Sequence, residues 1–272
     1  MQFKTQDNLN IAVVGSGISG ICSAYLLQKK HRVTLFEKKE YFGGHTHTVV
    51  LSDGPDKHTP VDTGFIVLNE RTYPNFIEFI SQLGVEKCRT DMSFSYYCEK
   101  TGLCYASQGL NAIFAQRANL FKPRYLRFVY EMVRFIKILR KEYLDNALPD
   151  TTLTGYAAQK GLHREVMDQF IVPMAAAIWS GSDFQVARFP IRTFAQFYEN
   201  HGLLAVTGHP PWYFVKGGSH TYVNAFLKSF KGQAVKNSGV ARISRSTDSV
   251  TMYFTDGEPR KFDAVVIAAH ED

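Results

Sequence analysis

The stretch IAVVGSGISG, residues 11–20, decides the fold of this chain of 272 residues. It begins in a short apolar run typical of a strand and leads into residues 18–30, where apolar side chains recur at helical spacing. The alternating, β-branched run RVTLFE, residues 32–37, predicts a second strand. A strand, a glycine-rich turn, a helix and a strand within about 30 residues predict a βαβ unit with parallel neighbouring strands.

The turn of this unit carries Gly15, Gly17 and Gly20 in G-x-G-x-x-G spacing, between strand and helix as the motif requires. The first glycine permits a tight turn, the second lets the backbone approach a pyrophosphate, and the third lets the helix pack closely on the strand. The helix N-terminus offers free N–H groups and a positive dipole end to the anion. We therefore expect a dinucleotide cradle rather than a glycine-rich turn without a ligand.

The second strand ends at Glu37, 20 residues beyond Gly17, where a carboxylate accepts hydrogen bonds from the ribose of adenosine. An acidic group there disfavours a 2′-phosphate and therefore NADP, but NAD and FAD carry the same ribose. The glycine pair Gly43 and Gly44 follows within seven residues, where a plain NAD domain usually has another helix. This pair lets the backbone pass close to the pyrophosphate a second time, which favours FAD.

The remainder of the chain predicts a second, inserted region. Residues 45–68 form two extended runs separated by turn residues. Amphipathic helical spacing follows, and the near-continuous apolar run at 263–269 is typical of a buried parallel strand that returns to the first sheet. We expect an α/β fold with a Rossmann-like, parallel-sheet FAD-binding domain at 1–70 and 211–272, and an inserted helix-rich α+β substrate domain at 71–210.

Composition excludes several other classes of protein. With 45% hydrophobic and 21% charged residues, the chain is globular rather than disordered or fibrous. It has no apolar run of about 18 residues that would span a membrane, and its polar N-terminus lacks a secretory pattern, so we expect a cytoplasmic protein. The four cysteines and the histidines His45, His47 and His58 lack the spacings of metal motifs, so no metal site is expected.

The segments VVGSGISGICSAYLL and VTLFEKKEYFGGHTHT resemble the FAD-binding segment of the flavin-containing amine oxidase and phytoene desaturase superfamily. Other stretches resemble one bacterial branch of it, described as predicted NAD/FAD-binding proteins or FAD-dependent oxidoreductases. These stretches span nearly the whole chain: PVDTGFIVLNERTYPN, DMSFSY, IVPMAAAIWS, FPIRTFAQFYENHGLLAV, VKGGSHTYV and FDAVVIAAHED. The resemblance implies a two-domain flavoprotein that binds FAD noncovalently.

The resemblance also implies roles for individual residues. The two glycine segments would meet the pyrophosphate and Glu37 the ribose, while the backbone of Val240 would contact adenine. His45 stands where many relatives have an arginine, and a histidine is only partly charged near neutral pH. Gly64 and Phe65 would approach the flavin ring. The expected cofactor-binding residues are Gly15, Ser16, Gly17, Ile18, Ser19, Gly20, Glu37, Lys38, Gly43, Gly44, His45, Gly64 and Val240.

Flavin enzymes often need no catalytic side chain beyond positioning, because the isoalloxazine ring accepts the hydride. The sequence identifies no general base. We expect an FAD-dependent oxidoreductase that takes hydride from a C–H bond of an apolar substrate of lipid, acyl or polyene type, with an amine as the alternative substrate. Because relatives continue well past residue 272, a truncated or noncatalytic protein of the same fold is an alternative of another class.

Aromatic residues supply the candidates for a substrate pocket: Phe65, Trp179 beside Ser180, and Tyr198. Core packing explains Trp179 equally well. Tyr198 stands with Asn200 and His201 in a polar cluster at a predicted helix end, for which capping of that helix is the alternative.

A basic stretch, residues 113–143, holds eight Lys or Arg against two acids, Glu131 and Glu142. Within residues 121–144 the basic side chains alternate with aromatic and aliphatic ones, a composition that suits peripheral contact with an anionic membrane. The alternative is helices that pack one face on a core and leave their charges in water. No nucleic-acid-binding pattern accompanies these residues, so no nucleic-acid partner is expected.

Overall fold

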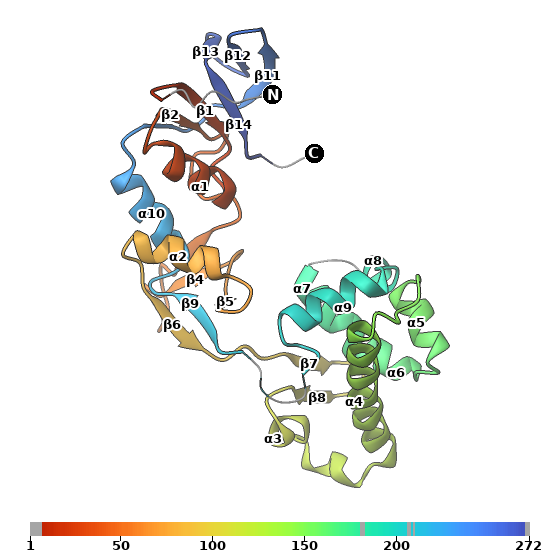
Figure 1. Ribbon diagram of the computed structural model, residues 1–272. Coiled ribbons are helices and arrows are strands. Elements are labelled where there is room, and N and C mark those ends of the chain that lie inside the picture. The colour runs from red at the N-terminus through yellow and green to blue at the C-terminus, as the bar shows by residue number, and fades with distance from the viewer. Residues whose placement is uncertain (1–6, 180–182, 206–207, 209, 270–272) are drawn as a thin grey trace. The chain divides into compact units, whose positions relative to one another are not determined.

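The structure is a computed structural model that describes residues 7–179, 183–205, 208 and 210–269 (Figure 1). The chain divides into two compact units. Unit 1 consists of Met1–Leu68, Tyr73–Thr90 and Tyr213–Asp272, and unit 2 of Asn69–Thr72 and Asp91–Trp212. Each unit is described by itself.

Unit 1 is built on a four-stranded parallel sheet of order β10-β2-β1-β14. The strands are β1 (Asn10–Val14), β2 (Arg32–Phe36), β10 (Gln233–Val235) and β14 (Ala264–Ile267), and helix α1 (Ile18–Leu27) connects β1 to β2. The predicted βαβ unit and parallel sheet are therefore confirmed. The last predicted strand does return beside β1, but it lies at the sheet edge and is half-buried, with Ile267 exposed, rather than buried.

Two layers cover the sheet. Val33 and Leu35 face one side, where they pack against α1, α2 (Pro74–Gln82) and α10 (His220–Ser229). Phe36, one residue further along the strand, faces the other side, as alternation along a strand requires. There it packs with Met252 and Phe262 of a three-stranded antiparallel sheet, whose strands are β11 (Val240–Arg245), β12 (Val250–Phe254) and β13 (Arg260–Phe262).

Further short strands complete unit 1. The two extended runs expected after the glycine pair are present as β3 (Thr48–Val50) and β4 (Pro60–Asp62), an antiparallel pair. A second three-stranded sheet has the order β5-β9-β6, with β5 (Leu68–Asn69), β6 (Lys87–Thr90) and β9 (Trp212–Val215).

The division of the chain differs from the expected boundaries by two residues at 69–70 and at 211–212, and by a longer segment at 73–90. We expected the insert to begin at residue 71, but residues 73–90, with helix α2 and strand β6, lie in unit 1. The reason is packing: Phe79 and Ile80 of α2 are buried in the same core as Tyr222 and Phe226 of α10. Amphipathic spacing identifies a helix, but it does not show which core the apolar face joins.

Unit 2 is helix-rich and contains a β-hairpin, in agreement with the expected α+β class, although the sequence patterns did not locate the hairpin. Its elements are β7 (Ser95–Cys98), β8 (Leu103–Ala106), α3 (Leu110–Ile113), the 3₁₀ helix η1 (Arg117–Phe121), α4 (Pro123–Leu144), α5 (Leu153–Gln159), α6 (Arg164–Val166), the π-helical turn η2 (Met167–Ile171), α7 (Val172–Trp179), α8 (Asp183–Ala187) and α9 (Ile191–Asn200). They enclose one aromatic-rich core.

Helix α4 is the long element of that core. Tyr125, Phe128, Met132, Phe135 and Leu139 are buried, three or four residues apart, which places them on one face of the helix. Its basic side chains Arg124, Arg127, Lys137, Arg140 and Lys141 are exposed, whereas Arg134 is half-buried and pairs with Glu131. One face of α4 is thus packed as the alternative for residues 121–144 describes, while peripheral membrane contact stays a prediction. In the described residues no helix is long and apolar enough to cross a membrane.

Candidate functional site

A cavity of about 1020 Å³ lies in unit 1 at the carboxyl ends of β1, β2 and β14. In parallel sheets this edge is where ligands bind, because the loops that follow neighbouring strands meet there. Its lining residues are Val14, Gly15, Ser16, Gly17, Ile18, Ser19, Phe36, Glu37, Lys38, Lys39, Gly43, Gly44, His45, Thr46, Phe65, Tyr73, Phe76, Tyr222, Ser238, Val240, Ala268 and Ala269.

The turn after β1 is held between the two neighbouring strands. The N–H of Gly15 donates to the carbonyl of Phe36 at 2.8 Å, and the N–H of Ala268 donates to the carbonyl of Val14 at 2.8 Å. Gly15 has φ of +95°, and a Cβ there would lie 2.6 Å from the carbonyl oxygen of Ala268. Only glycine fits this position.

The other two glycines of the motif have different surroundings. A Cβ on Gly20 would lie 1.8 Å from the carbonyl oxygen of Gly15, so the helix packs on the turn as closely as the motif predicts. A Cβ on Gly17 would have no neighbouring atom within 4 Å, and Gly17 lines the cavity. Gly17 is therefore open toward the space where a pyrophosphate is expected, while Gly20 serves packing and does not line the cavity.

A buried polar junction joins Glu37 to both glycine segments. The carboxylate of Glu37 accepts from the N–H of Ser16 at 3.0 Å, from its hydroxyl at 2.5 Å, and from the N–H of Lys39 at 3.0 Å. The N–H of Gly43 lies 3.2 Å from the hydroxyl oxygen of Ser16 and 3.1 Å from the carbonyl of Ser16. Ser16 thus ties the end of β2 to the second glycine segment, and the carboxylate retains acceptor capacity toward the cavity.

The two glycine segments are in direct contact. A Cβ on Gly44 would lie 2.9 Å from the Cα of Gly17, and the φ of Gly44 is +63°. Backbone therefore approaches the cavity from both segments, as expected for the FGGHT stretch. His45 also lines the cavity.

An aromatic group forms another part of the cavity wall. The ring of Phe76 packs against those of Phe65 and Tyr222, with centroids 5.1 and 5.3 Å apart. The Tyr222 hydroxyl lies 2.7 Å from the hydroxyl of Thr46, next to His45 in sequence. Burial raises the pKa of Tyr222 to about 12, although the hydrogen bond with Thr46 opposes the shift. Tyr222 is therefore a neutral phenol at physiological pH.

Asp62 fixes the position of α10 relative to β4. Its carboxylate accepts from the N–H of Ser219, at 2.8 and 2.9 Å, and from the hydroxyl of Ser219 at 2.7 Å. The hydroxyl of Thr48 on β3 donates to the same carboxylate at 2.5 Å. Because Ser219 precedes the first turn of α10, this clamp also places Tyr222 at the cavity.

These residues fit a dinucleotide. The cavity combines glycine backbone from two segments, an acidic acceptor at Glu37, and the cationic side chains of Lys38 and Lys39. Glu37 is the only acid among the described residues that line it. The glycine backbone and the lysines suit a diphosphate, and the carboxylate of Glu37 suits a ribose diol.

The structure brings most of the expected cofactor-binding residues to this cavity, and it separates others from it. Gly64 does not line the cavity, but a Cβ there would lie 2.0 Å from the carbonyl oxygen of His45, so its backbone supports that segment. Sequence reasoning missed ten of the lining residues: Val14, Phe36, Lys39, Thr46, Tyr73, Phe76, Tyr222, Ser238, Ala268 and Ala269. No local motif identifies them, because segments distant in sequence bring several of them to the cavity.

The other substrate-pocket candidates lie in unit 2. Trp179 stacks on Phe189 with centroids 4.7 Å apart, and Tyr198 stacks on Phe194 at 4.0 Å, so both belong to the aromatic core. The hydroxyl of Tyr198 is buried without a hydrogen-bond partner in the described part of the chain, and burial raises its pKa. Core packing therefore accounts for both rings. Ser180 lies outside the described residues.

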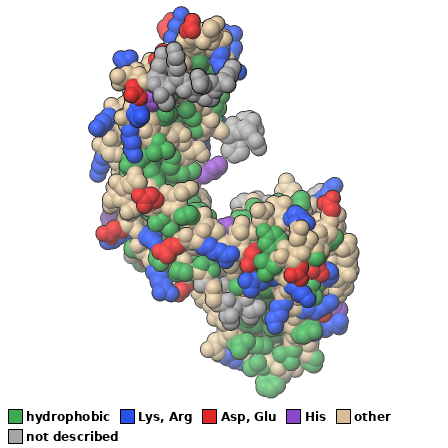
Figure 2. Space-filling model, viewed as in Figure 1, with side chains coloured by type: hydrophobic (Ala, Val, Ile, Leu, Met, Phe, Trp, Pro, Cys, Tyr) green, Lys and Arg blue, Asp and Glu red, His purple; other side chains and the backbone are tan. Residues whose placement is uncertain are grey.

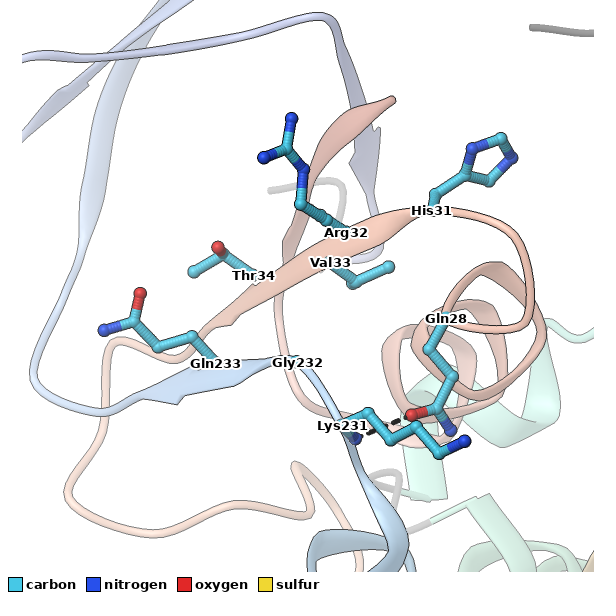
Figure 3. A pocket seen from close by; sticks show the side chains of 8 residues that line it. All are labelled: Gln28, His31, Arg32, Val33, Thr34, Lys231, Gly232 and Gln233. Carbon is cyan, nitrogen blue, oxygen red and sulfur yellow. Dashed lines mark hydrogen bonds between the residues drawn. The ribbon is translucent and has the colours of Figure 1, made fainter. Parts of the chain in front are cut away.

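A second, smaller cavity of about 560 Å³ lies at the opposite end of β2 (Figure 3). Its cations do not converge on one point: Figure 3 shows the side chains of Arg32 and Lys231 directed away from each other. The N–H of Lys231 donates to the side-chain oxygen of Gln28 at 2.8 Å. Nothing in this arrangement matches the expected cofactor. Among the described residues, no group of three or more His, Cys, Asp or Glu side chains could hold a metal ion.

Several solved structures have a fold similar to that of this chain. A putrescine oxidase variant with redesigned cofactor binding has a TM-score of 0.70 at 15% identity, over 96% of this chain and 58% of that one. Cyclohexylamine oxidase from Brevibacterium oxydans has a TM-score of 0.70 at 20% identity, with the same coverage. A fatty acid isomerase from P. acnes has a TM-score of 0.65 at 15% identity, over 98% of this chain and 60% of that one. The chain thus spans about three fifths of the length of these proteins.

The sequence comparison is more specific. No curated protein sequence matches the chain significantly. The family described as flavin containing amine oxidoreductase matches over residues 18–270, which is most of the chain. The superfamily resemblance and the FAD cofactor expected from the sequence are thereby confirmed. The chain belongs to the flavin-containing amine oxidoreductase family.

Proposed function

We propose that this chain binds FAD noncovalently in the unit 1 cavity and belongs to an oxidoreductase that takes hydride from a C–H bond of an apolar substrate. One observation carries the proposal: both glycine segments and the buried carboxylate of Glu37 line a single cavity at the carboxyl edge of the parallel sheet. When bound, FAD supplies the ring that accepts the hydride.

The chain's own residues have binding and positioning roles. Gly17, Gly44 and His45 would hold the diphosphate, Glu37 would accept hydrogen bonds from the ribose, and Val240 would contact the adenine. The junction of Ser16 with Glu37 and Gly43 keeps these groups in place before the cofactor arrives. Prior placement lowers the entropic cost of binding.

The cavity lining favours an apolar substrate. Besides Glu37, no carboxylate among the described lining residues is available to pair with an ammonium group. Phe65, Phe76 and Tyr222 provide aromatic surface instead. A fatty acyl chain or a polyene suits such a wall.

An amine is the second candidate substrate, because the family includes amine oxidoreductases and aromatic faces attract cations. Anaerobic mixing of the flavin-loaded protein with each class of compound distinguishes the two. We expect fatty acyl or polyene compounds to bleach the oxidised flavin band and primary amines to leave it unchanged. Bleaching by amines alone would replace the apolar proposal with the amine one.

A noncatalytic role is the third candidate. The protein would then carry flavin that dithionite reduces but no substrate of either class does. A preparation without yellow colour, which releases no flavin on heating and takes up none from solution, would instead contradict cofactor binding by this chain.

A further inference from the structure

One corner of unit 2 is both apolar and basic. It is formed by α3, η1 and the first turn of α4, residues 110–127, and is called the α3–α4 corner below. These residues include four Lys or Arg, namely Arg117, Lys122, Arg124 and Arg127, and no Asp or Glu. Half of the eight basic residues of the stretch 113–143 therefore lie at this end of α4, and both acids of that stretch lie outside the corner.

The apolar side chains of the corner are unusually exposed. Phe121 is 85% exposed and Leu110 is 73% exposed, and Leu120 and Leu126 are exposed as well. Figure 2 shows hydrophobic side chains gathered at the lower end of this unit, over α3 and the start of α4. Single exposed apolar residues are ordinary, but a cluster of four marks an interaction surface.

The segments that carry these exposed residues are themselves held together by packed contacts. The Tyr125 hydroxyl donates to the carbonyl of Ile113 at 2.5 Å, and the rings of Phe114 and Tyr125 pack with centroids 5.7 Å apart. Arg117 donates to the carbonyl of Phe114 at 3.2 Å. The three elements are thus joined beneath the surface, and the exposed side chains are presented from a packed base.

Two basic side chains of the corner carry charge that no acid in the described part of the chain neutralises. Lys122 and Arg127 are exposed and form no ion pair within the part of the chain that the structure describes. Arg124, by contrast, pairs with Glu165. A partner surface that neutralises Lys122 and Arg127 while it takes up the neighbouring apolar side chains must be anionic at its face and apolar just beneath it.

We propose that the α3–α4 corner docks on an anionic lipid membrane surface. Leu110, Leu120 and Phe121 enter the boundary between headgroups and acyl chains, and Lys122 and Arg127 contact the lipid phosphates. A nucleic acid would engage the basic side chains but leave the apolar ones in water. The surface is distinct from the buried face further along α4, where Phe128, Met132 and Phe135 pack in the core. Docking is independent of FAD binding and goes beyond the proposed function.

Vesicle co-sedimentation tests the proposal with the full chain. We expect binding to vesicles of phosphatidylcholine with about one third phosphatidylglycerol, weak binding to phosphatidylcholine alone, and release at high salt. Phe121→Ser and the pair Lys122→Glu with Arg127→Glu should each weaken binding at least about tenfold. The controls are Leu144→Ser and Lys137→Glu, exposed positions further along α4, which should stay within about twofold of the wild type.

A second readout places the corner in the lipid. Phe121→Trp should show a blue-shifted emission and protection from acrylamide when anionic vesicles are added, whereas Leu144→Trp should not. Vesicle binding that ignores the corner variants, or equal losses in the controls, would overturn the proposal. Absence of vesicle binding by the wild type would also overturn it. The corner would then serve another partner if the protein binds nucleic acid, or if Phe121→Ser changes its oligomeric state.

Discussion

Gly17 and Gly20 are both glycines of the G-x-G-x-x-G motif, but their surroundings differ in the structure. Gly17 has φ of −65°, which alanine also adopts, and its added Cβ meets nothing within 4 Å. We expect Gly17→Ala to leave the free energy of unfolding within about 0.5 kcal/mol of the wild type, and to weaken FAD binding at least about tenfold, because the methyl occupies pyrophosphate space. Thermal unfolding and FAD titration measure the two effects.

Gly20→Ala is the matched variant. Its Cβ would collide with the backbone of Gly15 at 1.8 Å, so the protein should lose several kcal/mol of stability or fail to fold. If Gly17→Ala destabilised the protein as much as Gly20→Ala, the separation of a binding glycine from a packing glycine would be wrong.

Ser16 carries the polar junction. Ser16→Ala removes the hydroxyl that donates to Glu37 and that lies beside the N–H of Gly43. Ser16 and Glu37 are both buried. The expected loss is about 1–3 kcal/mol, since Glu37 becomes less well satisfied in a buried position. Chemical denaturation monitored by circular dichroism provides the value, and Ser19→Ala, at an exposed position nearby, is the control. If Ser16→Ala lost no more stability than the control, the junction would not contribute to the stability of the fold.

Tyr222 gives the stability of the protein a dependence on alkaline pH. Burial raises its pKa from 10.0 to about 12, so between these values the unfolded phenol ionises while the folded one stays neutral. The folded state then binds more protons, and stability falls as pH rises through this window. Tyr222→Phe should be less stable at neutral pH, because it lacks the hydrogen bond to Thr46. Between neutral pH and a pH of about 12, its free energy of unfolding should fall by about 2 kcal/mol less than that of the wild type. Parallel declines in both proteins would contradict this.

Among the elements, the clamp of Asp62 on α10 links the hairpin of β3 and β4 to the aromatic wall. Asp62→Ala leaves the N–H and hydroxyl of the buried Ser219 without their acceptor. We expect a loss of about 2–3 kcal/mol in the free energy of unfolding. Asp56→Ala, in the exposed loop of the same hairpin, should stay within about 0.5 kcal/mol. Urea denaturation compares the two, and equal losses would show that the clamp contributes nothing.

Sequence patterns predicted the elements of the first 45 residues because the determinants there are local. Glycine spacing, strand alternation and the position of Glu37 all act within one βαβ unit. The assignment of α2 to unit 1 was beyond such reasoning, since its partners Tyr222 and Phe226 lie about 140 residues away in sequence. The hairpin of β7 and β8 was missed because an amphipathic helical texture was extended across short alternating runs.

For the whole molecule, the difference between local and long-range determinants explains which residues of the candidate site the sequence could predict. Gly15, Glu37 and Gly43 could be found from spacing, while Thr46, Phe76 and Tyr222 become neighbours only when α2, α10 and the second glycine segment pack together. For Trp179 and Tyr198 the sequence left a pocket and packing or capping roles open, and in the structure Tyr198 is buried in the core of unit 2 while Trp179 packs against it.

The central claim is that the unit 1 cavity is the FAD site of this chain. Titration of the purified protein with FAD, followed by competition with ADP and with FMN, tests it most directly. ADP shares the adenosine and diphosphate that Glu37 and the glycine segments would hold, whereas FMN does not. We predict that FAD binds and that ADP displaces it while FMN does not. No FAD uptake, or FAD binding that ADP leaves unchanged and Gly17→Ala does not weaken, would contradict it.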